Sequence, residues 1–339
     1  MQPLHLDTWR RLVAERPLAI LDTETTGDDA EQCGVCEIAV TGYGPAEVEA
    51  ALVAVAAGGE LAALPQPEPA WSFAQRVNPG LPIHPGATEV HGIRDEDVAG
   101  LAGIEAIAGN LQALAETHTI VTYNGRKFDL PILARLAGVR PRWSVDLMGL
   151  WRDALTRPVP GWFSEAERAA GGRPAPRLVG EQLLRCGGVG RPHTGAGKVF
   201  RDSLEGCHYA LLGHAVGDAH QALGDVLTTG RALFALLALW GTDGGDADAL
   251  ARRADWALAA VQDTPDGPMM AVGKHKGLLV RDVHAVDPSY LGWALCSDFD
   301  DGDKARIIAA IGEEAADRLV AGQARKGGGR GGRKPRAAA

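Results

Sequence analysis

The chain has 339 residues, 46% of them hydrophobic and 23% charged, which is the composition of a globular protein with a substantial core. No stretch approaches the roughly 18 uninterrupted apolar residues of a membrane span, and charged side chains interrupt the first 22 residues, so we expect no membrane contact, no signal peptide and a cytoplasmic location. The net charge is −9, but the last 17 residues hold six basic and no acidic side chains, so charge alone does not exclude a nucleic-acid partner.

The first predicted strand is the apolar run 18–21, which leads directly into Asp22 and Glu24. Side chains at positions i and i+2 of a strand point to the same side. Two neighbouring carboxylates repel and raise each other's pKa unless a cation neutralises them. A hard divalent ion such as Mg²⁺ prefers these oxygen ligands, so this strand end predicts a metal site.

Further elements follow from patterns of apolar residues and turn signals. Strands are predicted at 35–44, 73–79 and 119–125, a Pro-rich loop at 62–70, one continuous helix at 96–118, and a helix from Phe128 onward. The stretch 143–150 fits either a strand or the start of a helix. Residues 157–203 show the least regular pattern and include a helix at 178–186, and a long helix is predicted at 217–240 with a core face at Leu227, Phe234 and Leu237.

These elements group into a predicted domain organisation. Residues 1–240 form a large domain, 241–251 a linker, 252–322 a small α/β or helical module, and 323–339 a basic disordered tail. The five cysteines are odd in number and widely spaced, which argues against a disulfide framework. Cys33 and Cys36 form a CxxC pair that Cys207 and His208 could complete as a zinc site; the alternative is that they are small apolar side chains beside a strand.

Two later segments add ionisable residues that fit the same metal site. Asp129 ends the sequence TYNGRKFD, and His220 and Asp225 lie in HQALGD. Five residues on an ideal helix separate two side chains by roughly 140°. His220 should therefore precede the first helical turn and Asp225 should lie one turn inside it, with Asp218 and Gln221 as a capping box.

These segments together carry a family resemblance. DTETTG, NxxxFD at Asn124–Asp129 and HxAxxD at His220–Asp225 resemble the three motifs of the DEDDh exonuclease superfamily, which includes polymerase proofreading subunits and ribonuclease T. The segment 77–98 is similar to the stretch that these enzymes carry between the first two motifs. The matches cover roughly residues 17–238, and three motifs in the right order are far more specific than one.

The resemblance implies a fold, a cofactor and roles for residues. The fold would be ribonuclease H-like, a mixed five-stranded sheet with helices on both faces. Two Mg²⁺ or Mn²⁺ ions would be bound, and the general base would take a proton from the attacking water, a task suited to an imidazole. The metal ligands would be Asp22, Glu24, Asp129 and Asp225, and the base His220. Gln221 stands where the tyrosine subclass has its base, which favours the histidine subclass.

Other residues are candidates for binding the substrate, each with a purely structural alternative. They are Thr25, Thr26, Gly27, His91, Asn124, Phe128 and Lys198. For the first three the alternative is a turn, for His91 it is packing, and for Asn124 and Phe128 it is loop geometry and packing. The sequence GAGKV around Lys198 departs from a phosphate-binding P-loop. Lys198 would lie in a basic loop beside the substrate path, and the alternative is a solvated excursion of the chain.

The segment 273–301 resembles the C-terminal module of exonuclease X through GKxKG and DPxYLxW. Lys274, His275 and Lys276 with Tyr290 and Trp293 could contact single-stranded nucleic acid. The alternative is that the two aromatic rings pack in the module's own core, which we expect for Trp293.

We therefore expect a 3′-to-5′ exonuclease that releases nucleoside 5′-monophosphates from DNA 3′ ends, single-stranded DNA above all. The alternatives are an RNA 3′-exonuclease and a catalytically silent nucleic-acid-binding protein. The sequence leaves open proofreading, DNA repair or defence as the pathway, and a homodimer or an association with a polymerase, repair or defence complex.

Overall fold

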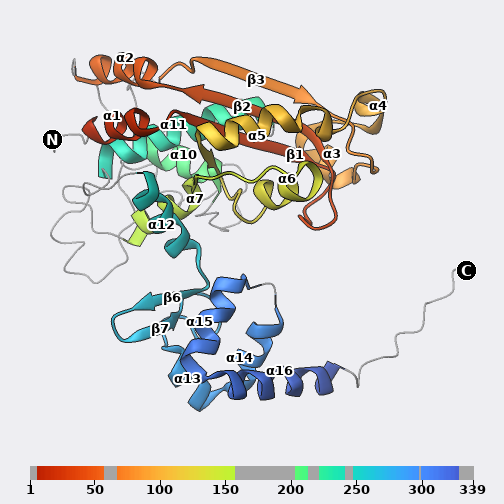
Figure 1. Ribbon diagram of the computed structural model, residues 1–339, viewed down its shortest axis with the longest axis vertical. Helices are drawn as coiled ribbons and strands as arrows, with labels where there is room; N and C mark the ends of the chain where they lie inside the picture. Colours follow the sequence, from red (N-terminus) through yellow and green to blue (C-terminus); the bar gives the residue numbers. More distant parts are fainter. Residues whose placement is uncertain are drawn as a thin grey trace, which may run out of the picture. The chain divides into compact units, whose positions relative to one another are not determined.

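The computed structural model, drawn as a ribbon in Figure 1, describes residues 6–56, 67–156, 203–212, 221–240, 247–297 and 299–327. The chain divides into two compact units, Met1–Asp255 and Trp256–Ala339. Several predictions fall outside the described residues, namely those on 62–66, on the segment 157–202 with Lys198, and on 213–220 with Asp218 and His220. Over the described ranges, no helix is long and apolar enough to cross a membrane.

A five-stranded mixed sheet forms the centre of the first unit. Its strands, in the order β3-β2-β1-β4-β5, are β3 (Trp71–Arg76), β2 (Val35–Tyr43), β1 (Leu18–Thr25), β4 (Thr119–Thr122) and β5 (Ser144–Asp146). The pairs β1–β2 and β2–β3 are antiparallel, whereas β1–β4 and β4–β5 are parallel. The predicted fold class, a mixed five-stranded sheet of the ribonuclease H-like kind with flanking helices, is confirmed.

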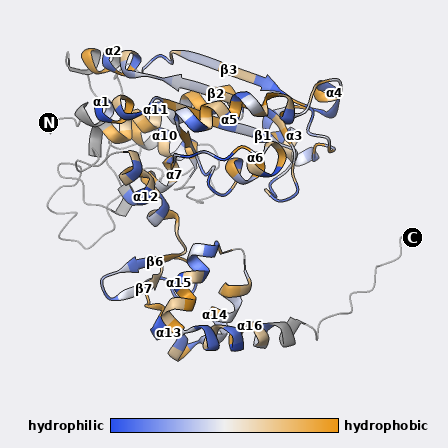
Figure 2. Ribbon diagram, viewed as in Figure 1, coloured by the Kyte–Doolittle hydropathy of each residue, from blue (hydrophilic) through white to orange (hydrophobic). Residues whose placement is uncertain are grey.

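Helices on one face of the sheet enclose the larger hydrophobic cluster. They are α1 (Leu6–Glu15), α2 (Pro45–Ala56), α7 (Leu147–Thr156), α10 (Leu204–Leu212), α11 (Ala222–Trp240) and α12 (Ala247–Leu258). Hydrophobic colour is concentrated on α10 and α11 in Figure 2. Phe234 and Leu237 of α11 are buried as predicted, whereas Leu227 is only partly buried. Trp9 donates a hydrogen bond to the carbonyl oxygen of Phe234 at 3.2 Å.

The opposite face of the sheet carries a second cluster. It is covered by a 3₁₀ turn at Ile104–Ile107, α5 (Ala108–Thr117) and α6 (Asp129–Ala137). Two short helices, α3 (Pro85–His91) and α4 (Asp95–Val98), pack on a small group around Ile83 and Ile93. Leu18 and Ile20 of β1 belong to the first cluster, and Ala19 and Leu21 to the second. The period of two therefore extends through the whole buried strand.

The predicted continuous helix at 96–118 is wrong. The chain instead forms α4, the 3₁₀ turn and α5, and Leu101 between them is 41% exposed. Gly100 and Gly103 interrupt the segment, and glycine disfavours a helix interior. The stretch 143–150 contains both of the structures considered for it, since β5 ends at Asp146 and α7 begins at Leu147.

The second unit is a small α/β module around its own core. It contains β6 (Val261–Thr264), β7 (Gly267–Met270), α13 (Val280–Val286), α14 (Pro288–Cys296), α15 (Asp301–Ile311) and α16 (Glu313–Gly327). Helix α12 begins inside the stretch predicted as a linker, since Ala247, Leu250 and Ala254 bury a helical face in the first unit. Helix α16 likewise extends to Gly327, inside the predicted tail. The predicted domain limits stay a prediction.

The prediction that Trp293 packs in this core is wrong, because its side chain is 49% exposed. Leu291 and Ala294 take the buried face of α14. A residue two positions after Leu291 is turned by roughly 200° around the helix axis, which directs Trp293 outward.

Candidate active site

Strand β1 presents Asp22 and Glu24 on one face, as its period of two requires. They follow Ile20 on the face that α11 covers, and Thr23 points to the other face. In the antiparallel register Asp22 lies opposite Ala39 of β2 and Glu24 opposite Glu37. Pairing with β2 thus fixes the backbone that carries both carboxylates.

Helix α11 supplies the third carboxylate, Asp225, from its first turn. The backbone N–H of Asp225 donates to the carbonyl oxygen of Gln221 at 2.9 Å, so the helical hydrogen bonding begins at this point. One carboxylate oxygen each from Asp22, Glu24 and Asp225 lies within 4.8 Å of the other two. Two sequence motifs that are 200 residues apart therefore meet at one point.

Asp129 opens α6 and reaches the same region from the opposite side. Its side chain is only 3% exposed, and the Thr23 hydroxyl donates a 2.6 Å hydrogen bond to its Oδ1. Asp129 is not one of the three residues whose oxygens lie within 4.8 Å of each other, but its charge raises the pKa of both Asp22 and Glu24. The fourth predicted ligand is thus an electrostatic neighbour of Asp22 and Glu24.

Burial and mutual repulsion raise the pKa values of the clustered carboxylates. Burial, followed by the charges of Asp129 and Asp225, raises the pKa of Asp22 well above its ordinary value. Burial and the charge of Asp225 raise the pKa of Glu24 from 4.5 to about 7. Burial raises the pKa of Asp129 from 3.8 to about 6, against the lowering effect of the Thr23 hydrogen bond.

These carboxylates fit a hard divalent cation. Each charged group that shifts the pKa of Asp22 or Glu24 is another carboxylate, so mutual repulsion opposes their ionisation. A bound divalent ion would reverse that effect and would take oxygen ligands at the convergence point. Among the described residues, Asp22, Glu24 and Asp225 are the one group of His, Cys, Asp or Glu side chains that could hold a metal. The zinc alternative is therefore not supported, and Cys33, Cys36 and Cys207 are buried and free.

Glu37 is a neighbour of the site that the sequence did not reveal. It lies opposite Glu24 on β2, and its charge raises the pKa of Asp22 and Glu24. Its Oε2 accepts the backbone N–H of Ala222 at 3.4 Å, at the first residue of α11. A carboxylate at a helix N-terminus is stabilised by the helix dipole. Glu37 thereby links β2 to the segment that carries Asp225.

Asp146 is a second residue that the sequence did not reveal. Its carboxylate accepts the backbone N–H groups of Asn124 at 2.9 Å, Arg126 at 3.1 Å and Met148 at 3.0 Å. Asn124 has a φ of 64°, a left-handed conformation that asparagine tolerates better than most residues. The loop that leads to Asp129 is therefore held by Asp146, and Asn124 has a structural role in that loop.

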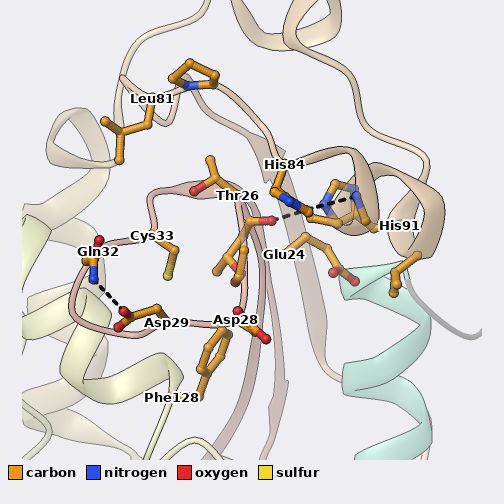
Figure 3. A pocket seen from close by; sticks show the side chains of 16 residues that line it. Glu24, Thr26, Asp28, Asp29, Gln32, Cys33, Leu81, His84, His91 and Phe128 are labelled. Atoms are coloured by element: carbon orange, nitrogen blue, oxygen red, sulfur yellow. Dashed lines mark hydrogen bonds between the residues drawn. The ribbon is translucent and has the colours of Figure 1, made fainter. Parts of the chain in front are cut away.

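A pocket of about 830 Å³ opens beside the acidic cluster (Figure 3). Its wall includes Glu24, Thr25, Thr26 and Gly27 from the first motif, Leu81, His84, Val90 and His91 from the segment around α3, and Phe128 from the second motif. A Cβ at Gly27 would meet no atom within 4 Å. This pocket is large enough for a nucleotide-sized ligand.

Hydrogen bonds fix the wall of this pocket. The Thr25 hydroxyl donates to the carbonyl oxygen of Gly27 at 2.7 Å, and the Thr26 hydroxyl accepts the N–H of Gly34 at 3.0 Å. His91 Nδ1 accepts the N–H of Ile93, so its Nε2 carries the proton and donates to the carbonyl oxygen of Thr25 at 3.1 Å. His91 thus joins α3 to the first motif (Figure 3).

Comparison with known proteins agrees with the motifs. Residues 19–135 match the exonuclease family model RNase_T, and the predicted resemblance to this exonuclease family is thereby confirmed. No curated protein matches the chain. The likeness of the second unit to the exonuclease X module stays a prediction.

Solved structures with a similar fold include exonucleases. E. coli exonuclease I in a zinc-bound complex with single-stranded DNA has a TM-score of 0.42 and 17% identity, over 66% of this chain and 40% of that one. Exonuclease X in complex with 5′ overhanging duplex DNA has a TM-score of 0.37 and 20% identity, over 70% of this chain and 99% of that one. The chain thus spans less than half the length of exonuclease I.

Proposed function

We propose that the protein is a metal-dependent 3′-to-5′ exonuclease that acts on DNA 3′ ends, with single-stranded DNA as its main substrate and nucleoside 5′-monophosphates as its products. The observation that carries the proposal is the convergence of Asp22, Glu24 and Asp225 within 4.8 Å beside an open pocket. The match of residues 19–135 to the exonuclease family model supports the reaction type.

Two Mg²⁺ or Mn²⁺ ions are proposed as cofactors, held by Asp22, Glu24, Asp129 and Asp225. When bound, such ions supply activation of the attacking water and stabilisation of the departing 3′-oxygen. These carboxylates come from β1, from the first residue of α6 and from the first turn of α11.

The remaining roles belong to residues around that centre. His220 is proposed as the general base, placed directly before Gln221 and the start of α11. Thr25, Thr26, Gly27, Phe128 and His91 are proposed to line the site of the terminal nucleotide, because all five border the pocket. Proton acceptance at His220 and ion binding at the carboxylates are then separate tasks.

The test uses a 5′-labelled 30-nucleotide single strand, its duplex and the RNA of the same sequence, each with Mg²⁺ or with EDTA. The proposal predicts a ladder that shortens from the 3′ end of the single-stranded DNA, with nucleoside 5′-monophosphates as products and no reaction in EDTA. Faster shortening of the RNA would reassign the substrate to RNA. Uncut DNA and RNA in Mg²⁺ and in Mn²⁺ would contradict the proposal and leave a binding protein.

A second measurement separates the base from the ligands. We expect His220→Ala to lose about 10²- to 10⁴-fold in rate at neutral pH, which is the usual contribution of a general base, and to bind Mn²⁺ as the wild type does. Loss of Mn²⁺ binding in this variant would instead make His220 a ligand.

A further inference from the structure

The surface of the second unit carries an exposed row of aromatic rings. The ring of His275 lies edge-on to that of Tyr290 with centroids 4.8 Å apart, Tyr290 is 5.2 Å from Trp293, and Trp293 is 5.9 Å from Phe299. Trp293 is 49% exposed, whereas the other three rings are partly buried. We call His275, Tyr290 and Trp293 with Phe299 the aromatic row.

The loop 273–277 packs against the Tyr290 ring of the aromatic row. Gly273 and Gly277 have φ values of 74° and 90°, which only glycine adopts without strain. A side chain at position 273 would collide with the Tyr290 hydroxyl, which is buried and has no hydrogen-bond partner. The Tyr290 ring therefore rests against the bare backbone of this loop, and Trp293 rests against Tyr290. An exposed tryptophan that is already held in place loses little conformational entropy when it binds a planar ligand.

One end of the row is basic. Lys274 and Lys276 flank His275 in the sequence, and both are exposed. Asp287, the one carboxylate that contacts this loop through described hydrogen bonds, is occupied by Lys274 Nζ, His275 Nε2 and the Ser289 hydroxyl at 2.8 to 2.9 Å. Lys276 is exposed and is not among the side chains that bond to Asp287.

The other end of the row is acidic: Asp300 and Asp303 make hydrogen bonds or ion pairs, and Asp301 is exposed. The side chain of Asp300 accepts the N–H of Asp303 as the cap of α15. Asp303 accepts the backbone N–H groups of Ala260 and Val261 at 2.9 Å and lies 3.5 Å from the Arg306 guanidinium. The negative charge of Asp300 and Asp303 is thus partly offset by a helix N-terminus and an arginine. The loop 273–277, which we call the lysine loop, carries the exposed Lys274 and Lys276.

We propose that the aromatic row and the lysine loop form a second nucleic-acid site, in which a base of a single strand stacks on Trp293 and neighbouring phosphates lie beside Lys276 and Lys274. Exposed aromatic rings next to cationic side chains are the usual elements of sequence-independent single-strand binding. Duplex DNA keeps its bases stacked inside and cannot use the ring. The site would retain single-stranded substrate, and it does not depend on the proposed hydrolysis.

The test measures the dissociation constant of a fluorescent 20-nucleotide single strand by anisotropy, with the full-length protein in EDTA so that metal-dependent hydrolysis cannot occur. We expect Trp293→Ala to weaken binding about tenfold, which corresponds to one stacked base, and Trp293→Phe to retain part of the affinity because a phenyl ring still stacks. Trp256→Ala is the matched control, since Trp256 is a 39% exposed tryptophan of the same unit outside the row.

The salt dependence of binding tests the lysine loop separately. Lys276→Gln is expected to reduce the slope of log K against log salt by about 0.7, the value for one phosphate contact on a single strand. The proposal is overturned if Trp293→Ala, with a wild-type melting temperature, binds the strand as tightly as Trp256→Ala does; the row would then be free for a protein partner. Because no cleavage is measured, this outcome is distinct from failure of the exonuclease proposal.

Discussion

The pKa values of two carboxylates, one in each unit, are shifted in opposite directions. Burial and neighbouring carboxylates raise the pKa of Glu24 to about 7. Hydrogen bonds from His275, Lys274 and Ser289 lower the pKa of Asp287 in the second unit. Glu24 faces like charges and gains from an added cation, whereas Asp287 already has its donors. The sign of the shift thus separates a carboxylate suited to ligand binding from one that holds a loop in place.

The largest effect is expected when the acidic cluster loses one ligand. Asp225→Asn keeps the shape of the side chain but removes one negative charge from the cluster. In that cluster, oxygens of Asp22, Glu24 and Asp225 lie within 4.8 Å of one another. We expect hydrolysis to fall by more than about 100-fold, beyond what the loss of an outer-shell partner costs at metal sites. Asp248→Asn is the control, because Asp248 also lies in the first turn of a helix but pairs with Arg16 at 3.1 Å. Equal rates in the two variants would contradict the assignment of Asp225.

Removal of Asp146 is expected to destabilise the loop that leads to Asp129. Asp146→Ala leaves three backbone N–H groups without their acceptor, and unsatisfied buried groups cost about 1 to 3 kcal/mol each. We expect the free energy of unfolding in urea to fall by about 3 kcal/mol or more. Asp146→Asn retains one acceptor oxygen and should lose less. A wild-type midpoint for the alanine variant would show that the loop is held by other contacts.

The pH dependence of stability should reveal the raised pKa values. In the metal-free protein the folded state binds a proton at Glu24 up to about pH 7, whereas the unfolded state releases it near the ordinary value of 4.5. The folded state therefore holds more protons between these values, and its stability falls as pH rises from about 4.5 to about 7. Added Mg²⁺ should raise the melting temperature at pH 8 and much less at pH 5. An equal Mg²⁺ effect at both values, or Glu24→Gln with an unchanged pH profile, would contradict this.

The opposite sign is expected at Asp287, with the smallest effect. Its folded pKa is lowered, so its contribution to stability is present above its ordinary pKa of 3.8 and is lost as pH falls below that value. Because Lys274 is largely exposed, the pair contributes little. Asp287→Asn should lower the melting temperature slightly at pH 7 and leave Mg²⁺ stabilisation unchanged. A loss of the Mg²⁺ effect would show that the two carboxylates are not independent.

The sequence predicts the parts of the site that depend on local geometry. Asp22 and Glu24 share a face because a strand has a period of two, and Asp225 lies in the first turn of a helix. Glu37 could not be found in this way, because its position beside Glu24 depends on the register of β1 and β2. The role of Asp146 likewise depends on a loop that closes over 20 residues of sequence.

The failures of prediction have local causes. The apolar spacing in 96–118 suits a helix, yet Gly100 and Gly103 divide that segment and two separate cores receive Val98 and Ile104. The spacing of three between Tyr290 and Trp293 predicts that both rings pack in the core, but Leu291 and Ala294 occupy the buried face of this nine-residue helix.

The central claim is that the carboxylates of β1 and α11 hold a divalent cation. Titration of Mn²⁺ into wild-type protein and into the Glu24→Gln, Asp225→Asn double variant at pH 8, followed by calorimetry, tests it directly. We predict saturable binding to the wild type and none to the double variant, with both proteins folded by circular dichroism. Identical stoichiometry and affinity in the two proteins would contradict the claim.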